Sequence, residues 1–341
     1  MVIDVKFPGG NIFVEKIEDD DVYLAPDLRD TEGRWFYWCF RVSEASGRRI
    51  RFHFTRENCL SDLGPALSLD DGWTWKWLKP RGKDDSFEYV FPENSKTVMF
   101  SMGMPYTERN LKRILDKHDR NPCLKTDILC RSNKGRDVER IFLGDSNSQA
   151  DCEFRIFITA RHHCCEMMAS YVLEGVIEAV LLEPELSGWF RENAKFAIVP
   201  FVDKDGVEQG DQGKNRRPHD HNRDYIPDAI YAETKAIMNF IPEWTKGKTF
   251  FFLDVHCPWI KGKGNDTVYI PGSKEEKNWN EEVAFGKLLM KVNDGPIPYS
   301  IDDNLPFGKD WNVGALKGLK TSTSWAFEAG AKVSISLEIP Y

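Results

Sequence analysis

The spacing of the apolar residues changes near residue 105, and this change constrains the fold more than any other feature of the chain. Before it, short runs of aromatic and β-branched residues alternate with turn-prone segments, which is typical of strands. After it, runs with helical spacing alternate with short apolar runs. We therefore expect a β-rich domain in residues 1–105 and an α/β domain in residues 106–341.

The first domain is expected to be an antiparallel β-sandwich, because its predicted strands are short and regularly spaced. These strands are Phe36–Val42, Arg49–Thr55, Gly72–Leu78, Phe87–Phe91 and Lys96–Ser101. In the second domain we expect a mixed sheet with strands at Glu153–Thr159, Phe196–Val202, Thr249–Val255 and Lys332–Ile339. The predicted helices are Thr107–Lys117, Glu166–Leu182, Pro227–Phe240 and Lys274–Val292.

Charge and composition exclude several classes of partner. The net charge of −8 and the pI near 5.5 argue against nucleic acid, and the one basic cluster, residues 214–217, is short. No apolar run approaches the roughly 18 residues of a membrane span, and the first residues lack the features of a secretory signal. The eight cysteines contain no CxxC pair. We therefore expect a reduced, cytoplasmic protein with no nucleic-acid and no membrane partner.

His163 and Glu166 lie at the junction of a predicted strand and a predicted helix. They are three residues apart, so on a first helical turn both side chains can face one point. An imidazole and a carboxylate are ligands for Zn²⁺, whose catalytic sites use three protein ligands and leave a fourth position open. The pair alone is a weak signal, and the alternative is a helix N-terminus with incidental polar residues.

Two further candidates lie at the ends of apolar strands. His256 ends a strand of nearly continuous apolar residues, and ligand sites of α/β sheets lie beyond the carboxyl ends of strands. Glu338 lies within the last apolar strand, where a carboxylate is costly to bury unless it has a partner or a function. The alternatives are a core histidine and a solvent-facing glutamate on an edge strand.

Residues 200–225 form a long polar segment rich in Gly, Asp and Arg after a predicted strand. Long loops without regular structure are usually functional in compact domains. Asn222 and Arg223 in this segment could bind a carboxylate, because a guanidinium group grips a carboxylate through two hydrogen bonds.

Taken in chain order, these pieces resemble the zinc metallocarboxypeptidase family. The matching pieces are His163-Cys-Cys-Glu166, Asp205-Gly206, Asp220-His-Asn-Arg223, Asp254-Val-His256 and Ser336-Leu-Glu338. The run ARHHCCEMMASYVLEG resembles the ARxHxxE signature of the cytosolic carboxypeptidase subfamily. The runs WFYWCFRVSEASGRRIRFHFT and GWTWKWLK resemble that subfamily's N-terminal β-sandwich domain, so the resemblance spans nearly the whole chain.

The resemblance implies a role for each matched position. His163, Glu166 and His256 would bind one Zn²⁺ per chain, and Glu338 would be the general base and later the proton donor. Asp220 would accept the other N–H of His163. Asn222 and Arg223 would bind the terminal carboxylate of the substrate.

The chain departs from the family pattern in three places. The position of the family's oxyanion-stabilising arginine falls on Gly213, so the resemblance leaves Arg216 or Arg217 for that role. The loop before the catalytic glutamate normally holds a tyrosine, but none occurs between Tyr299 and Tyr341. The family fold continues into a C-terminal helix, whereas this sequence ends three residues after Glu338.

The predicted function is therefore zinc-dependent hydrolysis of the C-terminal amide bond of peptides or protein tails. A zinc-dependent N-acyl amino acid deacylase or amidase would share the metal site. A non-catalytic binding protein with a decayed site is the third hypothesis, which the departures favour and the intact ligand pattern opposes.

Overall fold

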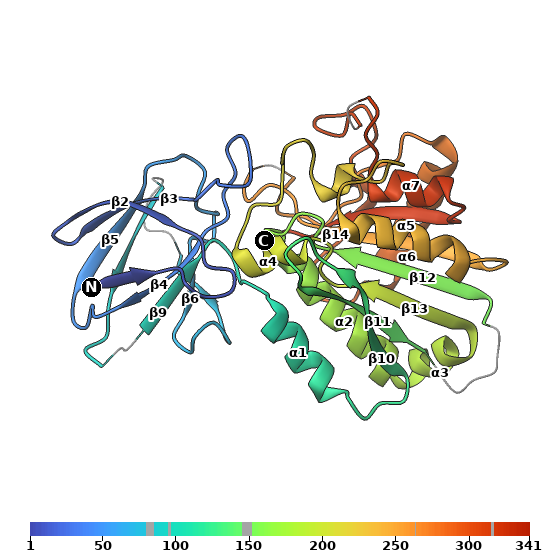
Figure 1. The fold of residues 1–341 in the computed structure, drawn as a ribbon, viewed down its shortest axis with the longest axis horizontal. Coiled ribbons are helices and arrows are strands. Elements are labelled where there is room, and N and C mark those ends of the chain that lie inside the picture. Colours follow the sequence, from blue (N-terminus) through green and yellow to red (C-terminus); the bar gives the residue numbers. More distant parts are fainter. Residues whose placement is uncertain (80–84, 95–96, 145–151, 263, 315–316) are drawn as a thin grey trace.

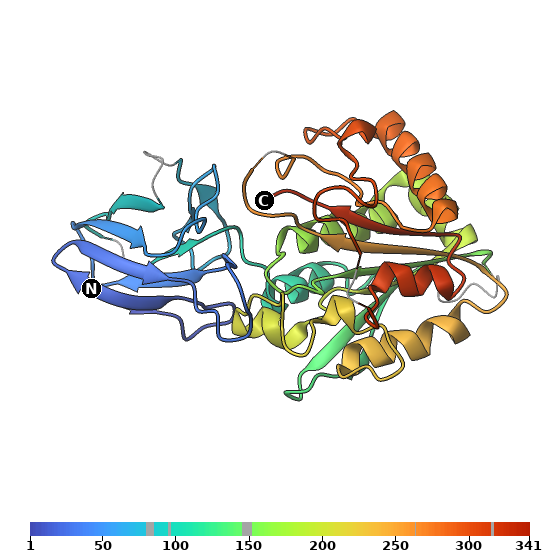
Figure 2. The ribbon, with the colours of Figure 1, turned by 90° about the horizontal axis from the view of Figure 1, so that it is seen from above.

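The computed structural model describes residues 1–79, 85–94, 97–144, 152–262, 264–314 and 317–341. Two sheets formed by residues 2–101 lie beside an α/β part that contains one larger sheet (Figures 1 and 2). The sheets thus fall on either side of the boundary expected near residue 105. Among the described residues, no helix is long and apolar enough to cross a membrane.

The first part is a sandwich of a five-stranded sheet, in the order β1-β4-β9-β6-β7, and a four-stranded sheet, in the order β2-β3-β5-β8. β3 pairs with β5 in parallel, so the four-stranded sheet is not wholly antiparallel. The strands are β1 (Val2–Asp4), β2 (Phe13–Glu18), β3 (Asp21–Ala25), β4 (Cys39–Ser43), β5 (Arg49–Phe54), β6 (Ala66–Ser68), β7 (Lys76–Trp77), β8 (Ser86–Val90) and β9 (Thr97–Ser101).

Two predicted strands of this part are shorter than expected. The backbone N–H of Tyr37 donates to Gln212 Oε1 (2.8 Å), and Gln212 Nε2 donates to the carbonyl of Tyr37 (2.8 Å), so β4 begins only at Cys39. The carboxylate of Asp70 accepts the backbone N–H of Thr74 (2.9 Å) and forms a turn that confines β7 to two residues. Lys96, the start of another predicted strand, lies outside the described residues.

The second part has a six-stranded sheet in the order β10-β11-β13-β12-β14-β15. The neighbouring strands β13, β12, β14 and β15 are mutually parallel. β10 pairs with β11, and β11 with β13, in antiparallel fashion, so the sheet is mixed as expected. Its strands are β10 (Leu124–Arg131), β11 (Asp137–Leu143), β12 (Phe154–Ala160), β13 (Ala194–Val199), β14 (Thr249–His256) and β15 (Val333–Glu338).

Helices cover both faces of this sheet, which explains the apolar runs of its strands. Core residues of α2, α3 and α6 pack on one face, and those of α5 and α7 pack on the other. The helices are α1 (Glu108–Lys117), α2 (Met168–Leu182), α3 (Pro184–Asn193), α4 (Lys204–Gln209), α5 (Ala232–Trp244), α6 (Glu276–Val292) and α7 (Ser322–Glu328), with short 3₁₀ turns η1 (His221–Arg223) and η2 (Ile301–Asp303).

The four predicted helices begin one to five residues later than predicted, and the shifts of α5 and α2 have clear structural consequences. The backbone N–H groups of Ile230 and Tyr231 donate to the carboxylate of Asp224 (2.8 and 3.0 Å), so the chain before Ala232 is a turn rather than the start of α5. α2 begins at Met168, which places His163 and Glu166 in the turn before it and not on its first turn.

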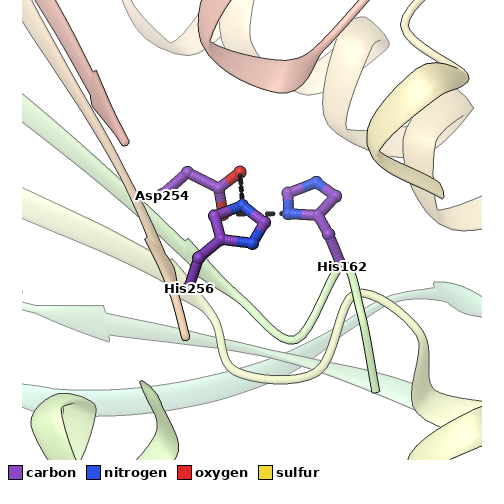
Figure 3. A group of neighbouring side chains, drawn as sticks. All are labelled: His162, Asp254 and His256. Atoms are coloured by element: carbon purple, nitrogen blue, oxygen red, sulfur yellow. Dashed lines mark hydrogen bonds and ion pairs between the residues drawn. The ribbon is translucent and has the colours of Figure 1, made fainter. Parts of the chain in front are cut away.

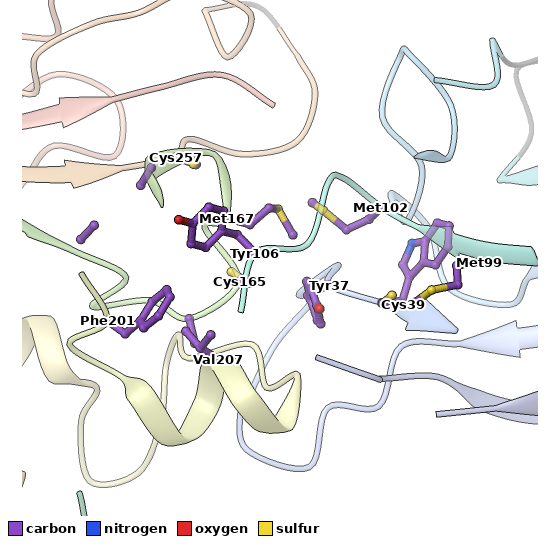
Figure 4. Close-up of a cluster of buried hydrophobic side chains, with 14 of the residues drawn as sticks. Tyr37, Cys39, Met99, Met102, Tyr106, Cys165, Met167, Phe201, Val207 and Cys257 are labelled. Carbon is purple, nitrogen blue, oxygen red and sulfur yellow. The ribbon is translucent and has the colours of Figure 1, made fainter. Parts of the chain in front are cut away.

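One hydrophobic core runs through both parts of the chain. Figure 4 shows side chains of the sandwich, among them Tyr37 and Met102, close to Met167 and Val207 of the α/β part. Gly210 lies at this junction with φ = +70°, and a Cβ atom there would be 2.7 Å from the carbonyl oxygen of Gly9. The sandwich therefore packs tightly against the side of the α/β part that carries the turn before α2.

Candidate metal centre and active site

The predicted site residues gather at the carboxyl ends of the parallel strands, where α/β sheets bind ligands. His163 and Glu166 follow β12, His256 is the last residue of β14, and Glu338 is the last residue of β15. The parallel register of β14 and β15 sets His256 directly beside Glu338. Segments that are far apart in the sequence thus converge at one edge of the sheet.

His163, Glu166 and His256 form a compact cluster. His163 Nδ1 lies 2.9 Å from Glu166 Oε1, and His256 Nδ1 lies 2.7 Å from Glu166 Oε2. One nitrogen or oxygen atom from each of the three lies within 4.8 Å of the others. This is the group that the sequence predicted to bind a metal, and its three side chains can contact a common point.

A second group shares His256 with the first and contains His162 and Asp254 (Figure 3). Asp254 Oδ1 lies 2.9 Å from His162 Nδ1 and accepts from Thr159 Oγ1 (2.8 Å). Asp254 Oδ2 lies 2.8 Å from His256 Nε2. Ser322 Oγ also donates to Asp254 Oδ2, so each carboxylate oxygen of Asp254 has two partners. Because the group is also fully buried, we infer that His162 and Asp254 hold His256 in place rather than bind a metal.

The charges of Asp254, His162 and His256 shift one another's pKa values. Burial alone would raise the pKa of Asp254, but the neighbouring imidazoles of His162 and His256 lower it below its ordinary value. Burial opposes a charge on His256, whereas the carboxylates of Asp254 and Glu166 on either side raise its pKa. The buried carboxylate of Asp254 therefore keeps its charge and fixes the orientation of the His256 ring.

Glu338 is buried beside the metal-ligand candidates. Burial raises the pKa of its carboxyl to about 7, with opposing effects from His256, which lowers it, and Glu166, which raises it. Among the described residues, Glu338 Oε2 has no hydrogen-bond partner. A buried carboxylate oxygen without a partner is costly, so Glu338 is a candidate for a functional role.

Asp220 lies on the other side of His163, with its Oδ1 3.7 Å from His163 Nε2. Burial would raise the pKa of Asp220, but its interaction with His163 lowers it. The ring of His163 thus faces Glu166 through one nitrogen and Asp220 through the other, which is the arrangement expected for a ligand and the carboxylate that orients it.

Asn222 and Arg223 lie in η1, close to His256. Asn222 Nδ2 is 3.2 Å from His256 Nε2, and Asn222 Oδ1 accepts the backbone N–H of Ser322 (2.9 Å). Arg223 is partly buried and donates to the carbonyl of Asn222 (2.8 Å). The structure therefore brings both residues to the site, but the amide of Asn222 is engaged with protein groups.

Arg216 and Arg217 do not join this cluster, so their contacts give no support to the expectation that one of them stabilises the oxyanion. The guanidinium of Arg216 contacts Asp203 (2.6 Å), Asp30 (3.0 Å) and Asp211 (3.2 Å). The side chain of Arg217 is 81% exposed and pairs with Glu32. Three carboxylates hold the first guanidinium in a structural position, and the second extends into solvent.

Lys214 is the cation that the sequence interpretation missed. Its Nζ lies 2.6 Å from Glu166 Oε1, and its side chain is 15% exposed. Burial would lower the pKa of Lys214, but the carboxylate of Glu166 raises it, so the ammonium group stays charged. The only signal in the sequence was its place next to Gly213, the position on which the family's arginine falls.

Tyr269 supplies a phenol beside Glu338, although no tyrosine precedes Glu338 in the expected loop. The two residues form an antiparallel bridge, in which each backbone N–H donates to the other's carbonyl (3.2 and 2.9 Å). Residues directly opposite in such a pair have side chains on the same face. Burial and the charge of Glu338 raise the pKa of Tyr269.

Comparison with known proteins agrees with this geometry, although no protein-family profile matches the chain. The sequence is 25% identical to cytosolic carboxypeptidase 6 of Caenorhabditis elegans over 75% of this chain and 62% of that protein. It is 23% identical to cytosolic carboxypeptidase 6 of Mus musculus over 85% of this chain and 59% of that protein. The chain thus spans about six tenths of the length of these relatives.

Solved structures share the whole fold. A metallo-carboxypeptidase from Burkholderia cenocepacia superposes with a TM-score of 0.78, 20% identity and coverage of 99% of this chain and 90% of that chain. A metallo-carboxypeptidase from Pseudomonas aeruginosa gives a TM-score of 0.77, 20% identity and coverage of 100% and 90%. The fold is therefore that of the metallo-carboxypeptidases. The sequence relatives described above are named cytosolic carboxypeptidases, which confirms the resemblance drawn from the motifs.

Proposed function

We propose that this chain is a zinc-dependent carboxypeptidase that hydrolyses the C-terminal amide bond of peptides or protein tails. The observation that carries this proposal is the convergence of His163, Glu166 and His256 beside Glu338, whose Oε2 has no hydrogen-bond partner in the part of the chain that the structure describes. Relatives in sequence and in fold carry the name carboxypeptidase, which supports the same reaction class.

The donor set fits one zinc ion per chain. Two imidazoles and one carboxylate are the usual protein ligands of a catalytic zinc site, and they leave a fourth position open. Asp254 and Asp220, which contact His256 and His163, have the position and charge of carboxylates that orient ligating imidazoles. Bound zinc would supply a water molecule of lowered pKa and polarise the scissile carbonyl.

The protein's own groups would perform the proton transfers. Glu338 would accept a proton from the attacking water and then donate it to the departing amine, a task for which its raised pKa is suited. Arg223, which lies in η1 beside the cluster, would bind the free carboxylate at the end of the substrate, together with Asn222 once its amide turns toward the ligand. The free carboxylate would thus define the substrate class.

The proposed location is the cytoplasm. Seven of the cysteines form no disulfide, which fits a reducing compartment: Cys39, Cys59, Cys123, Cys130, Cys164, Cys165 and Cys257. The name of the sequence relatives supports the same location.

The test is to measure zinc content and hydrolysis on paired peptides with free and amidated C-termini. We expect one zinc per chain and cleavage of the free form only. Glu338→Gln should retain zinc and lose turnover, whereas the exposed Glu328→Gln should retain both. Zinc binding with cleavage of acylated amino acids would instead support the amidase hypothesis. A protein that binds zinc and cleaves neither class would contradict the proposal.

A further inference from the structure

Lys214 occupies a defined place between the α/β part and the sandwich. Its ammonium group lies 2.6 Å from Glu166 Oε1 on one side. On the other side, the ring of Trp35 from the sandwich lies 5.1 Å from Nζ, within the range of a cation–π contact. A lysine that is mostly removed from solvent is costly unless it is paired, so the presence of Lys214 at the metal-ligand candidates requires an explanation.

The backbone around Lys214 is held by Asp30 and Thr31 of the sandwich. Asp30 Oδ2 accepts the backbone N–H of Gly213 (2.9 Å) and the Nε–H of Arg216 (3.0 Å). The hydroxyl of Thr31 donates to the carbonyl of Lys214. These bonds lie on both sides of the lysine, so its side chain leaves a fixed backbone and needs little reorganisation to act.

Gly213 explains why the cation is at residue 214. A Cβ atom at residue 213 would lie 2.4 Å from the backbone nitrogen of Cys164, in the turn that carries the ligand candidates. Its φ of +75° also favours glycine. Residue 213 therefore cannot carry a side chain, and the next residue is the first that can send a cation toward Glu166.

We propose that Lys214 is a catalytic residue that stabilises the negative charge developing on the carbonyl oxygen of the scissile amide. The inference rests on the proposed function. An ammonium group has three N–H donors, of which one faces Glu166, so others remain for an oxygen atom at the cluster. Arg216 is engaged by three carboxylates and Arg217 is exposed, which leaves Lys214 as the cation placed for this role among the described residues.

The test compares the wild-type protein with Lys214→Met and Lys214→Gln, using a peptide analogue that carries a tetrahedral phosphinate in place of the scissile amide. Its binding and that of the matched amino acid product are measured by calorimetry on zinc-loaded protein. We expect the variants to bind the phosphinate about 10²–10³-fold more weakly, in line with the loss of one donor to the transition state. Product affinity should change less than about threefold, because the product lacks the tetrahedral group.

Zinc affinity distinguishes catalysis from support of Glu166. The ammonium group and a zinc ion would share the same carboxylate and repel each other, so removing the lysine should leave zinc affinity unchanged or higher. A tenfold or greater loss of zinc affinity in both variants would show that Lys214 only positions Glu166, and would overturn the proposal. Lys214→Gln keeps a polar side chain of similar length and carries the test if Lys214→Met does not fold.

Lys204→Met is the matched control. Lys204 is fully buried, whereas Lys214 is mostly buried. Lys204 pairs with a carboxylate, Glu139 (2.7 Å), away from the cluster. We expect this variant to lose stability but to bind phosphinate within about threefold of wild type. If the wild type cleaves peptides in a zinc-dependent reaction but both Lys214 variants bind the phosphinate as tightly as the wild type, the inference about Lys214 is refuted and the proposed function stands. If the wild type cleaves no peptide, the proposed function itself fails.

Discussion

Replacing Asp254 with Asn tests whether the buried network behind His256 stabilises the fold as the structure indicates. The carboxylate accepts hydrogen bonds from Thr159 and Ser322 and lies against the imidazoles of His162 and His256. An amide at this place removes the charge and turns an N–H₂ group toward donors. Removing one partner of a buried charged group typically costs about 3–5 kcal/mol, and we expect the free energy of unfolding to fall by that amount.

The pH dependence follows from the lowered pKa of Asp254. Burial opposes the charge, but the neighbouring imidazoles bring the folded pKa below the ordinary value of 3.8. A carboxylate with a lowered folded pKa stabilises the protein above its unfolded pKa, and the contribution is lost as the pH falls through the folded pKa. The difference between wild type and Asp254→Asn should therefore shrink below about pH 4, where the carboxylate is protonated. It should also decline as the pH rises above 6.5 through the raised pKa of His256, because Asp254 stabilises the charged imidazole.

The assay is equilibrium unfolding in urea, followed by circular dichroism with a chelator present so that metal release does not contribute. Asp228→Asn, at an exposed site, is the control and should change the free energy of unfolding by less than about 0.5 kcal/mol. In a separate titration, Asp254→Asn should weaken zinc binding about 10–100-fold. A variant as stable as the control would refute the network argument.

Three further results are expected. Gly213→Ala should lower the free energy of unfolding by about 1–3 kcal/mol more than Gly247→Ala, as measured by urea unfolding. Both glycines have positive φ, but only at residue 213 would a Cβ atom lie 2.4 Å from a backbone atom. Trp38→Ala should lower the free energy of unfolding by about 3–5 kcal/mol, since the side chain is fully buried, and equal stability would contradict the core described above. Zinc at 100 times its dissociation constant should add about 2.7 kcal/mol to the wild type, and His163→Ala should lose that gain in thermal unfolding.

The sequence predicted several strands that have an apolar face, but it missed β3 and β11, whose burial also alternates. β5, β8, β12 and β14 lie within one or two residues of their predicted ranges, because the period of their apolar residues follows their burial. β10 and β2 went undetected for the opposite reason. Most of their residues are exposed, so polar side chains occur on both faces and no period of two appears.

Elements specified by single side-chain contacts were also missed. α4 lies inside the segment expected to be a loop, because it has six residues and depends on the carboxylate of Asp203, which caps the N–H of Gly206 (2.9 Å). The start of α5 depends on Asp224 in the same way. Such contacts join residues without any periodic pattern, so the sequence gives no sign of them.

The ligand candidates were predictable because each lies at a strand end or in a short spaced pair, and the chain order of these pieces is itself informative. Lys214 was not predictable, because its position depends on contacts between the two parts of the chain. Asp30 and Trp35 of the sandwich hold its backbone and its ammonium group, while Glu166 of the α/β part supplies its partner. The same carboxylate of Asp30 also binds Arg216, which explains why that guanidinium lies away from the cluster. The sandwich therefore determines which cation reaches the site, and the site is complete only when both parts of the chain are folded together.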